Sequence, residues 1–73
     1  MPKEEKVDAL LFGGENRFIR SLRQLRGQDV EICLGSGIII NGKLIEVFSD
    51  HLFIEAHRGQ YRVRLLTIEY VRA

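Results

Sequence analysis

A run of alternating apolar residues in the middle of the chain constrains the fold most strongly. Val30, Ile32 and Leu34 occupy every second position, and Leu52 and Ile54 repeat this spacing after a polar turn. A period of two places successive side chains on opposite faces of an extended strand, so one face of each strand should be buried. Consecutive strands of this kind, joined by short turns, predict a mostly β, antiparallel domain rather than a helical bundle.

Residues 15–26 have the period of a helix instead. Their apolar members recur at spacings of three and four and would form one stripe along a helix: Phe18, Ile19, Leu22 and Leu25. Gly27 follows the stripe, and glycine is the residue that most often ends a helix. We therefore predict a helix over residues 15–26, ahead of the strands.

Five strands are predicted after this helix. Residues 38–48 contain Asn41-Gly42, which is a hairpin signal but also suits one long strand bent sharply at Gly42. We favour the bent strand, because a hairpin would leave only three or four residues on each side. The other predicted strands cover residues 29–34, 52–56, 61–66 and 67–71.

These elements predict two regions and a barrel. Residues 1–14 are expected to be a flexible N-terminal tail, although its apolar part, residues 7–12, has a second interpretation as a segment that docks on the barrel or on a neighbour. Residues 15–73 are expected to form the domain, a helix followed by a five-stranded, strongly bent antiparallel SH3-like barrel.

Size and cysteine content favour an oligomer. A chain of 73 residues buries only about 60% of its unfolded surface, so its stability margin is thin. The single Cys33 allows no disulfide within one chain, and no local cluster of metal ligands is present, so we expect no metal and no cofactor. Residues 61–66 and 68–71 contain neither proline nor lysine, and unprotected edge strands of this kind invite pairing with another chain.

The charge and hydropathy of the chain limit the kinds of partner that it can bind. The net charge is +1, which does not by itself indicate a nucleic-acid-binding protein, but eight of the eleven basic residues are arginines. Arg20, Arg23 and Arg26 recur every three residues along the predicted helix, either as a solvated edge or as a basic rim for phosphates. No apolar run is long enough to span a membrane, and the lone Cys33 fits a reducing cytoplasm.

Several short motifs follow one another in a fixed order along residues 16–72. They are Val30-x-Ile32-x-Leu34-x-x-Gly37, then Gly42-x-Leu44 and Asp50, then Val63-Arg64 and Ile68-x-x-Val71. This order resembles the two motifs of the Sm-like family, which includes the Sm, Lsm and Hfq proteins. The helix resembles that of Hfq most closely, through Phe18-Ile19-x-x-Leu22-Arg23-x-x-Arg26.

The chain also departs from that family. Asp50 lies two residues further along the chain than the corresponding aspartate of the family motif, and it is not followed by asparagine. Leu65 follows Arg64 at a position where Sm proteins have glycine. The Tyr-Lys-His signature of Hfq is absent, and Cys33 and Ile39 stand where Hfq uses an aromatic residue and a lysine for adenine-rich RNA. The resemblance therefore implies fold and ring assembly more strongly than base recognition.

The resemblance implies a site made of one loop and one strand face that lie toward the pore of a ring. Asp50 and His51 share one loop, and Arg62 and Arg64 share one strand face, so His51 would stack on a base and Arg64 would meet phosphate. The alternative for Asp50 and His51 is ordinary turn chemistry. The alternative for the two arginines is ion pairing with Glu55 and Glu69.

The sequence thus gives two functional hypotheses and predicts no catalytic residue. The first is a cytoplasmic Sm-like protein that binds single-stranded RNA as a homo-oligomeric, six- or seven-membered ring. The second is an oligomeric structural or adaptor barrel that binds protein partners rather than RNA. The clustered arginines favour the first hypothesis, whereas the near-neutral charge and the missing Hfq residues favour the second.

Overall fold

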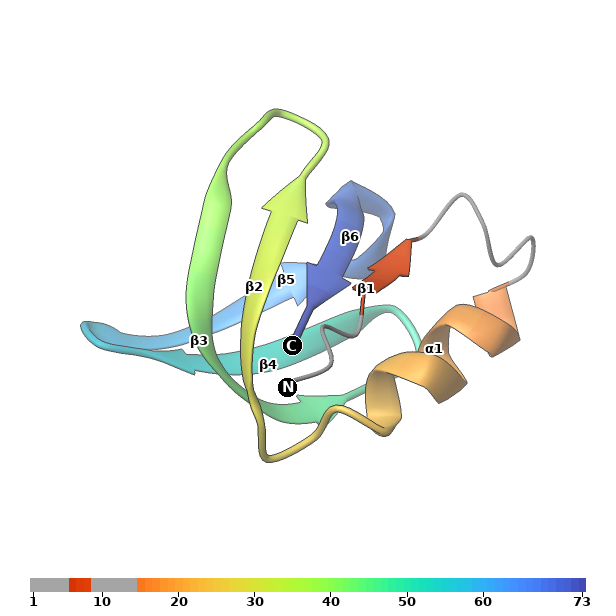
Figure 1. Cartoon of the computed structure of the whole chain (residues 1–73), viewed down its shortest axis with the longest axis horizontal. Coiled ribbons are helices and arrows are strands. Elements are labelled where there is room, and N and C mark those ends of the chain that lie inside the picture. Colours follow the sequence, from red (N-terminus) through yellow and green to blue (C-terminus); the bar gives the residue numbers. More distant parts are fainter. Residues whose placement is uncertain (1–5, 9–14) are drawn as a thin grey trace, which may run out of the picture.

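A computed structural model of the chain describes residues 6–8 and 15–73. Its elements, in chain order, are β1 (Lys6–Asp8), α1 (Glu15–Arg23), β2 (Asp29–Leu34), β3 (Ile39–Val47), β4 (His51–Ala56), β5 (Gly59–Arg64), the 3-10 turn η1 (Leu65–Thr67) and β6 (Ile68–Arg72). The strands form one antiparallel sheet in the order β1-β6-β2-β3-β4-β5 (Figure 1). The mostly β, antiparallel architecture with one short helix is as predicted from the sequence.

The sheet is open, whereas the sequence predicted a barrel. Strands β2 to β5 follow one another as a meander, and β6 returns to pair with β2. Among the described residues, no strand pairs with β5 on its other side. The Leu65 N–H donates to the Asp50 carbonyl at 3.0 Å, which ties the start of η1 to the β3–β4 turn, and β6 begins after η1.

The helix ends three residues earlier than predicted. After Arg23, the N–H groups of Gln24, Leu25 and Arg26 donate to carbonyls three residues back, at 3.3, 2.9 and 3.3 Å. These bonds tighten the chain into turns, which often happens at the end of a helix. Gly27 then takes a φ of 84° and donates its N–H to the Leu44 carbonyl at 2.7 Å, which ties the turn to β3.

The bent-strand interpretation of residues 38–48 is confirmed, since β3 is one continuous strand that curves strongly in Figure 1. Gly42 lies where β4 crosses closest, because a Cβ atom there would lie 2.6 Å from the Glu55 carbonyl oxygen. Two residues later the register with β4 shifts, and Ile45 is the extra residue of a β-bulge. A bulge of this kind bends a strand further.

The core lies between the curved sheet and α1. It contains the whole predicted helical stripe, with Leu22 and Leu25 fully buried, and the inward residues of β2, β4 and β6, among them Ile32, Leu52 and Val71. No polar or charged side chain is buried among those that the structure describes. Within residues 6–8 and 15–73, no helix has the length and apolar character required to cross a bilayer.

The short strand β1 was not predicted. It pairs with the outer edge of β6, with Val7 opposite Val71, inside the range that the sequence assigned to a flexible tail. Residues 9–12 of the apolar segment lie outside the described residues. The prediction that both of the last two strands are edges is therefore right for β5 and wrong for β6, because β1 lies against β6.

Candidate functional site

The outer face of β4 and β5 carries three of the four residues predicted to face a ring pore. His51 pairs in register with Arg64, and Phe53 pairs with Arg62. The residues between them, such as the fully buried Leu52, point into the core, so His51, Arg62 and Arg64 share the opposite, solvent-facing side. The alternation of this hairpin therefore brings these side chains together from two strands.

His51 is held by its neighbours in the turn between β3 and β4. Its ring stacks on Phe48, with ring centroids 4.6 Å apart and planes inclined by 22°. His51 Nδ1–H donates to the Asp50 carboxylate at 2.6 Å, and this hydrogen bond is the main reason that the pKa of Asp50 lies below its usual value. Asp50 thus orients the imidazole, while the bond from the Phe48 N–H to the His51 carbonyl, at 2.8 Å, closes the turn.

Arg62 and Arg64 are exposed, and neither forms an ion pair with another described residue. The alternative prediction, pairing with Glu55 and Glu69, is thus not seen in this part of the chain. Glu55 lies opposite Gln60 in the register, and Glu69 lies on β6, which is not a neighbour of β5. Both guanidinium groups are consequently available to an anion from solution.

The helix arginines divide into two groups. Arg20 and Arg23 line a hollow of about 300 Å³ together with Ile19 and Ser49, and Ser49 belongs to the same turn as Phe48. Arg23 Nε also donates weakly, at 3.5 Å, to the carbonyl of Val47. This hollow places two of the three predicted rim arginines beside the turn that holds His51.

Arg26 instead has a partner of its own. Its Nη1 donates to Glu46 Oε1 at 2.9 Å, and the Val47 N–H donates to the same oxygen at 3.0 Å. The Val47 bond first, and Arg26 second, lower the pKa of Glu46. For Arg26 the solvated helix edge, with an ion pair to the neighbouring strand, is the interpretation that the structure supports.

We group the residues around this turn under the name arginine track. It runs from α1, over the β3–β4 turn, to the outer face of β4 and β5, and it comprises Arg20, Arg23, Phe48, His51, Arg62 and Arg64. Guanidinium groups suit phosphate, and stacked planar rings suit a flat, unsaturated group. Phe48 was missed by sequence reasoning. The available signal was an aromatic residue at a strand end directly before a Ser-Asp turn.

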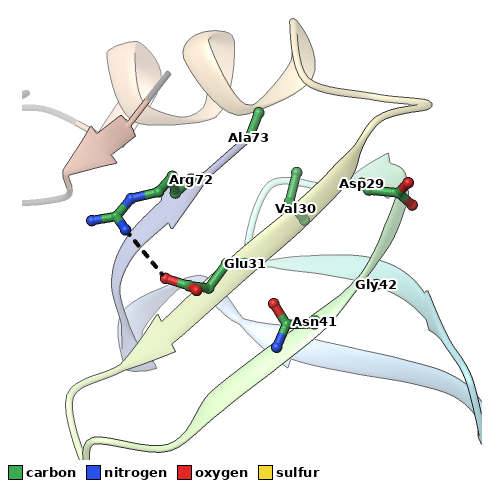
Figure 2. A pocket seen from close by; sticks show the side chains of 7 residues that line it. All are labelled: Asp29, Val30, Glu31, Asn41, Gly42, Arg72 and Ala73. Carbon is green, nitrogen blue, oxygen red and sulfur yellow. Dashed lines mark ion pairs between the residues drawn. The ribbon is translucent and has the colours of Figure 1, made fainter. Parts of the chain in front are cut away.

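A second hollow is formed by residues of β2, of β3 and of the end of the chain at β6 (Figure 2). It measures about 430 Å³ and is lined by Asp29, Val30, Glu31, Asn41, Gly42, Arg72 and Ala73. Figure 2 shows Arg72 and Glu31 facing each other. Arg72 Nη1 lies 3.8 Å from Glu31 Oε2, and the Tyr70 hydroxyl donates to the same carboxylate at 3.0 Å. That hydrogen bond is the main cause that raises the pKa of Tyr70. Because Arg72 faces Glu31 and Asp29 adds a further negative charge, this hollow does not extend the arginine track.

No group of three or more His, Cys, Asp or Glu side chains placed to hold a metal occurs among the residues described. Comparisons with protein-family models, with curated proteins and with solved structures find no match for this chain.

Proposed function

We propose that this protein is a cytoplasmic, non-catalytic, Sm-like protein that binds single-stranded RNA along the arginine track. The observation that carries the proposal is the stacked pair of rings, Phe48 and His51, with Arg64 opposite His51 in the register and Arg62 on the same face. Arg20 and Arg23 lie beside the same turn. The acidic side chains along this surface are Asp50, which is bonded to His51, Glu46, which is bonded to Arg26, and Glu55, on the outer face of β4. Cations alternating with planar groups are the usual chemistry of single-strand binding.

The roles follow from the chemistry of each side chain. Phe48 and His51 together offer a flat surface on which a base can stack, and stacking of this kind tolerates any base. Arg62 and Arg64 lie beside it on β5 and would bind the phosphates on either side of that base. Arg20 and Arg23 would touch only the backbone and fix its path without reading sequence.

The order of elements supports the Sm-like, SH3-like assignment. A helix precedes a meander of four strands, and a last strand returns to pair with the first strand of that meander. This is the order that the sequence resemblance implies. We propose that this curved, open sheet is a divergent form of the small barrel of that class, and that it assembles as a homo-oligomeric ring, six- or seven-membered by analogy. In the described part of the chain β5 pairs only with β4, and this open edge supports assembly.

A binding titration tests the RNA proposal. Fluorescence anisotropy with uridine-rich and adenine-rich oligonucleotides at low salt is expected to show saturable binding, which Arg64→Ala weakens. Arg58→Ala is the matched control, because it removes the same charge from the exposed β4–β5 turn, outside the arginine track. Cys33→Ala, on β2, is a second control that leaves the charge unchanged.

The outcome distinguishes RNA binding at a specific site from general electrostatic attraction. Equal losses for Arg64→Ala and Arg58→Ala would mean that binding follows net charge rather than the track. Phe48→Ala should cost about 1–3 kcal/mol of binding free energy if a base stacks on it. Unchanged affinity in Phe48→Ala would remove the base-stacking role.

The adaptor hypothesis is kept because of a different surface. Ile39 and Tyr61, which are 50% and 44% exposed, line a hollow of about 500 Å³ beside the β4–β5 turn. Apolar residues gathered at an open hollow suit a protein side chain better than a phosphate. If a folded, intact oligomer binds neither oligonucleotide, the adaptor function is the one that remains.

A further inference from the structure

Strand β3 extends beyond the strand that pairs with it on one side. Its register with β2 runs from Ile39 to Lys43, whereas its register with β4 begins only at Lys43. Within the described part of the chain, residues 39–41 therefore have β2 on one side and no strand on the other, as the upper half of β3 shows in Figure 1. A free strand edge presents alternating backbone N–H and C=O groups with which another extended chain can pair.

An apolar hollow lies along this free edge, and we call it the β3 notch. It measures about 500 Å³, and its apolar lining consists of Ile39 and Ile40 together with Ala56 and Tyr61 from the β4–β5 hairpin. Ile39 and Ile40 are successive residues of one strand, so they lie on opposite faces of the sheet. Because both line the same hollow, the β3 notch follows the edge of the strand rather than one face of the sheet.

The polar part of the β3 notch is basic. His57 and Arg58, in the turn between β4 and β5, complete its lining together with Asn41, and the lining contains no carboxylate. Arg58 is exposed and forms no ion pair with another residue of the ranges 6–8 and 15–73. A guanidinium group of this kind binds a carboxylate through charge-assisted hydrogen bonds. The charge of the β3 notch therefore complements an acidic ligand.

We propose that the β3 notch binds an extended, acidic peptide segment of another protein, which adds to β3 as a short strand. The peptide backbone would pair with residues 39–41, and one apolar side chain would enter the hollow beside Ile40 and Tyr61. An acidic side chain two positions away would meet Arg58, because alternate side chains of a strand share one face. This inference rests on the adaptor function and names its class of partner; it does not depend on RNA binding by the arginine track.

Fluorescence anisotropy with labelled peptides tests the inference on the full chain. The probe is the end-blocked peptide Thr-Leu-Thr-Glu-Thr-Thr, and its matched partners carry lysine in place of glutamate or serine in place of leucine. The probe should bind saturably, and each replacement should weaken binding by about tenfold or more, through loss of a charged hydrogen bond or of a buried leucine. Alternate N–H groups of the probe would face β3, so one of two alternately N-methylated versions should fail to bind.

Variants of the chain show whether the probe binds at the β3 notch. Arg58→Ala should weaken binding by about tenfold, and Arg58→Glu should prefer the lysine peptide. Arg64→Ala is the matched control, because it removes the same charge from the arginine track and should leave peptide affinity unchanged. Ile39→Thr keeps a β-branched residue but removes apolar surface, so it should weaken binding, whereas Ile45→Thr, at the exposed bulge residue, should not.

Each contrary result overturns the inference. Absence of saturable binding, or equal affinity for the glutamate and lysine peptides, would exclude an acidic partner. Equal affinities of Arg58→Ala and Arg64→Ala, or of Ile39→Thr and Ile45→Thr, would place the peptide elsewhere, and full binding of both N-methylated versions would exclude strand addition. Displacement of the probe by a uridine-rich oligonucleotide would assign the β3 notch to nucleic acid. The RNA proposal is tested separately, since Arg64→Ala is there the variant expected to lose affinity and Arg58→Ala is the control.

Discussion

At the scale of single residues, the carboxylate of Glu46 connects β3 to the end of the helix. The Val47 N–H and the Arg26 guanidinium both donate to it, and both lower its pKa below the ordinary value of 4.5. A carboxyl group with a lowered pKa in the folded state stabilises that state above its unfolded pKa. The contribution disappears as the pH falls through the folded pKa.

Glu46→Gln should therefore flatten the acid side of the stability profile. As the pH falls below about 4.5, the parent chain is expected to lose unfolding free energy faster than the variant does. Urea midpoints measured at several pH values on both sides of that point check this. The remaining slope should fall again in Glu46→Gln/Asp50→Asn, because Asp50 also has a lowered pKa through its bond to His51. A single variant with the full parental slope would contradict the role given to Glu46.

Sequence reasoning reached most of the candidate site but not its internal contacts. Alternation along β4 and β5 was enough to place Arg62 and Arg64 on one face, and the register then adds His51. The stack of Phe48 on His51 depends on how the β3–β4 turn closes, which periodicity does not describe. The pairing of Arg26 with Glu46 likewise joins residues from different elements, and only the packed structure brings them together.

At the scale of elements, the missing side chain of Gly42 allows the bent strand β3 to approach β4 closely. A methyl group there would meet the Glu55 carbonyl oxygen at 2.6 Å, and backbone cannot move aside easily. Gly42→Ala should cost about 1–3 kcal/mol of unfolding free energy. For a domain of this size that corresponds to a loss of roughly 4–8 °C in Tm per kcal/mol.

Gly35→Ala is the matched control for that substitution. A Cβ atom at Gly35 would lie 3.8 Å from the Thr67 carbonyl oxygen, which is an ordinary contact. Its thermal midpoint should stay close to that of the parent chain. Equal losses at both glycines would show that the close approach at Gly42 is not what requires glycine there.

The packing of α1 gives a second prediction at this scale. Leu22 is fully buried between the helix and the sheet, whereas Leu66 is 97% exposed. Leu22→Ala should cost about 2–5 kcal/mol, because it leaves a cavity in the core. The same change at Leu66 should alter the stability of the monomer by no more than about 0.5 kcal/mol. Chemical denaturation at low protein concentration compares the two, and a large loss at Leu66 would contradict the exposed position.

Periodicity predicted the elements that are long enough to show a period. The five main strands and the bend in β3 follow from alternation and from Gly42. The helix is shorter than its apolar stripe, because Leu25 stays buried while the chain around it has already tightened into turns. Strand β1 has three residues, too few for alternation to be recognised, and it is defined by its partner β6 rather than by its own sequence.

At the scale of the whole molecule, net charge and local charge give different expectations for how RNA affinity depends on salt concentration. The chain carries only +1 overall, yet the arginine track gathers four guanidinium groups on one surface. If each binds a phosphate, the logarithm of affinity should fall with the logarithm of salt concentration with a slope of roughly −0.7 per contact, or about −2.8 for four. Arg64→Ala should reduce the magnitude of that slope by about 0.7, whereas Arg58→Ala should leave it unchanged. Titrations at several salt concentrations measure both slopes, and a slope near zero would exclude phosphate as the ligand.

The return of β6 to β2 has a consequence for the order in which the molecule folds. Strands β2 to β5 meet partners that are their neighbours in the sequence, but Leu34 meets Ile68 only after the whole meander lies between them. Contacts distant in sequence require closure of a long loop and tend to form late. Val71→Ala should therefore mainly accelerate unfolding, while Ile54→Val in β4 should mainly slow folding. Stopped-flow folding and unfolding rates separate the two cases. Strand β6 would then be the last of these strands to join the sheet and the first to leave it.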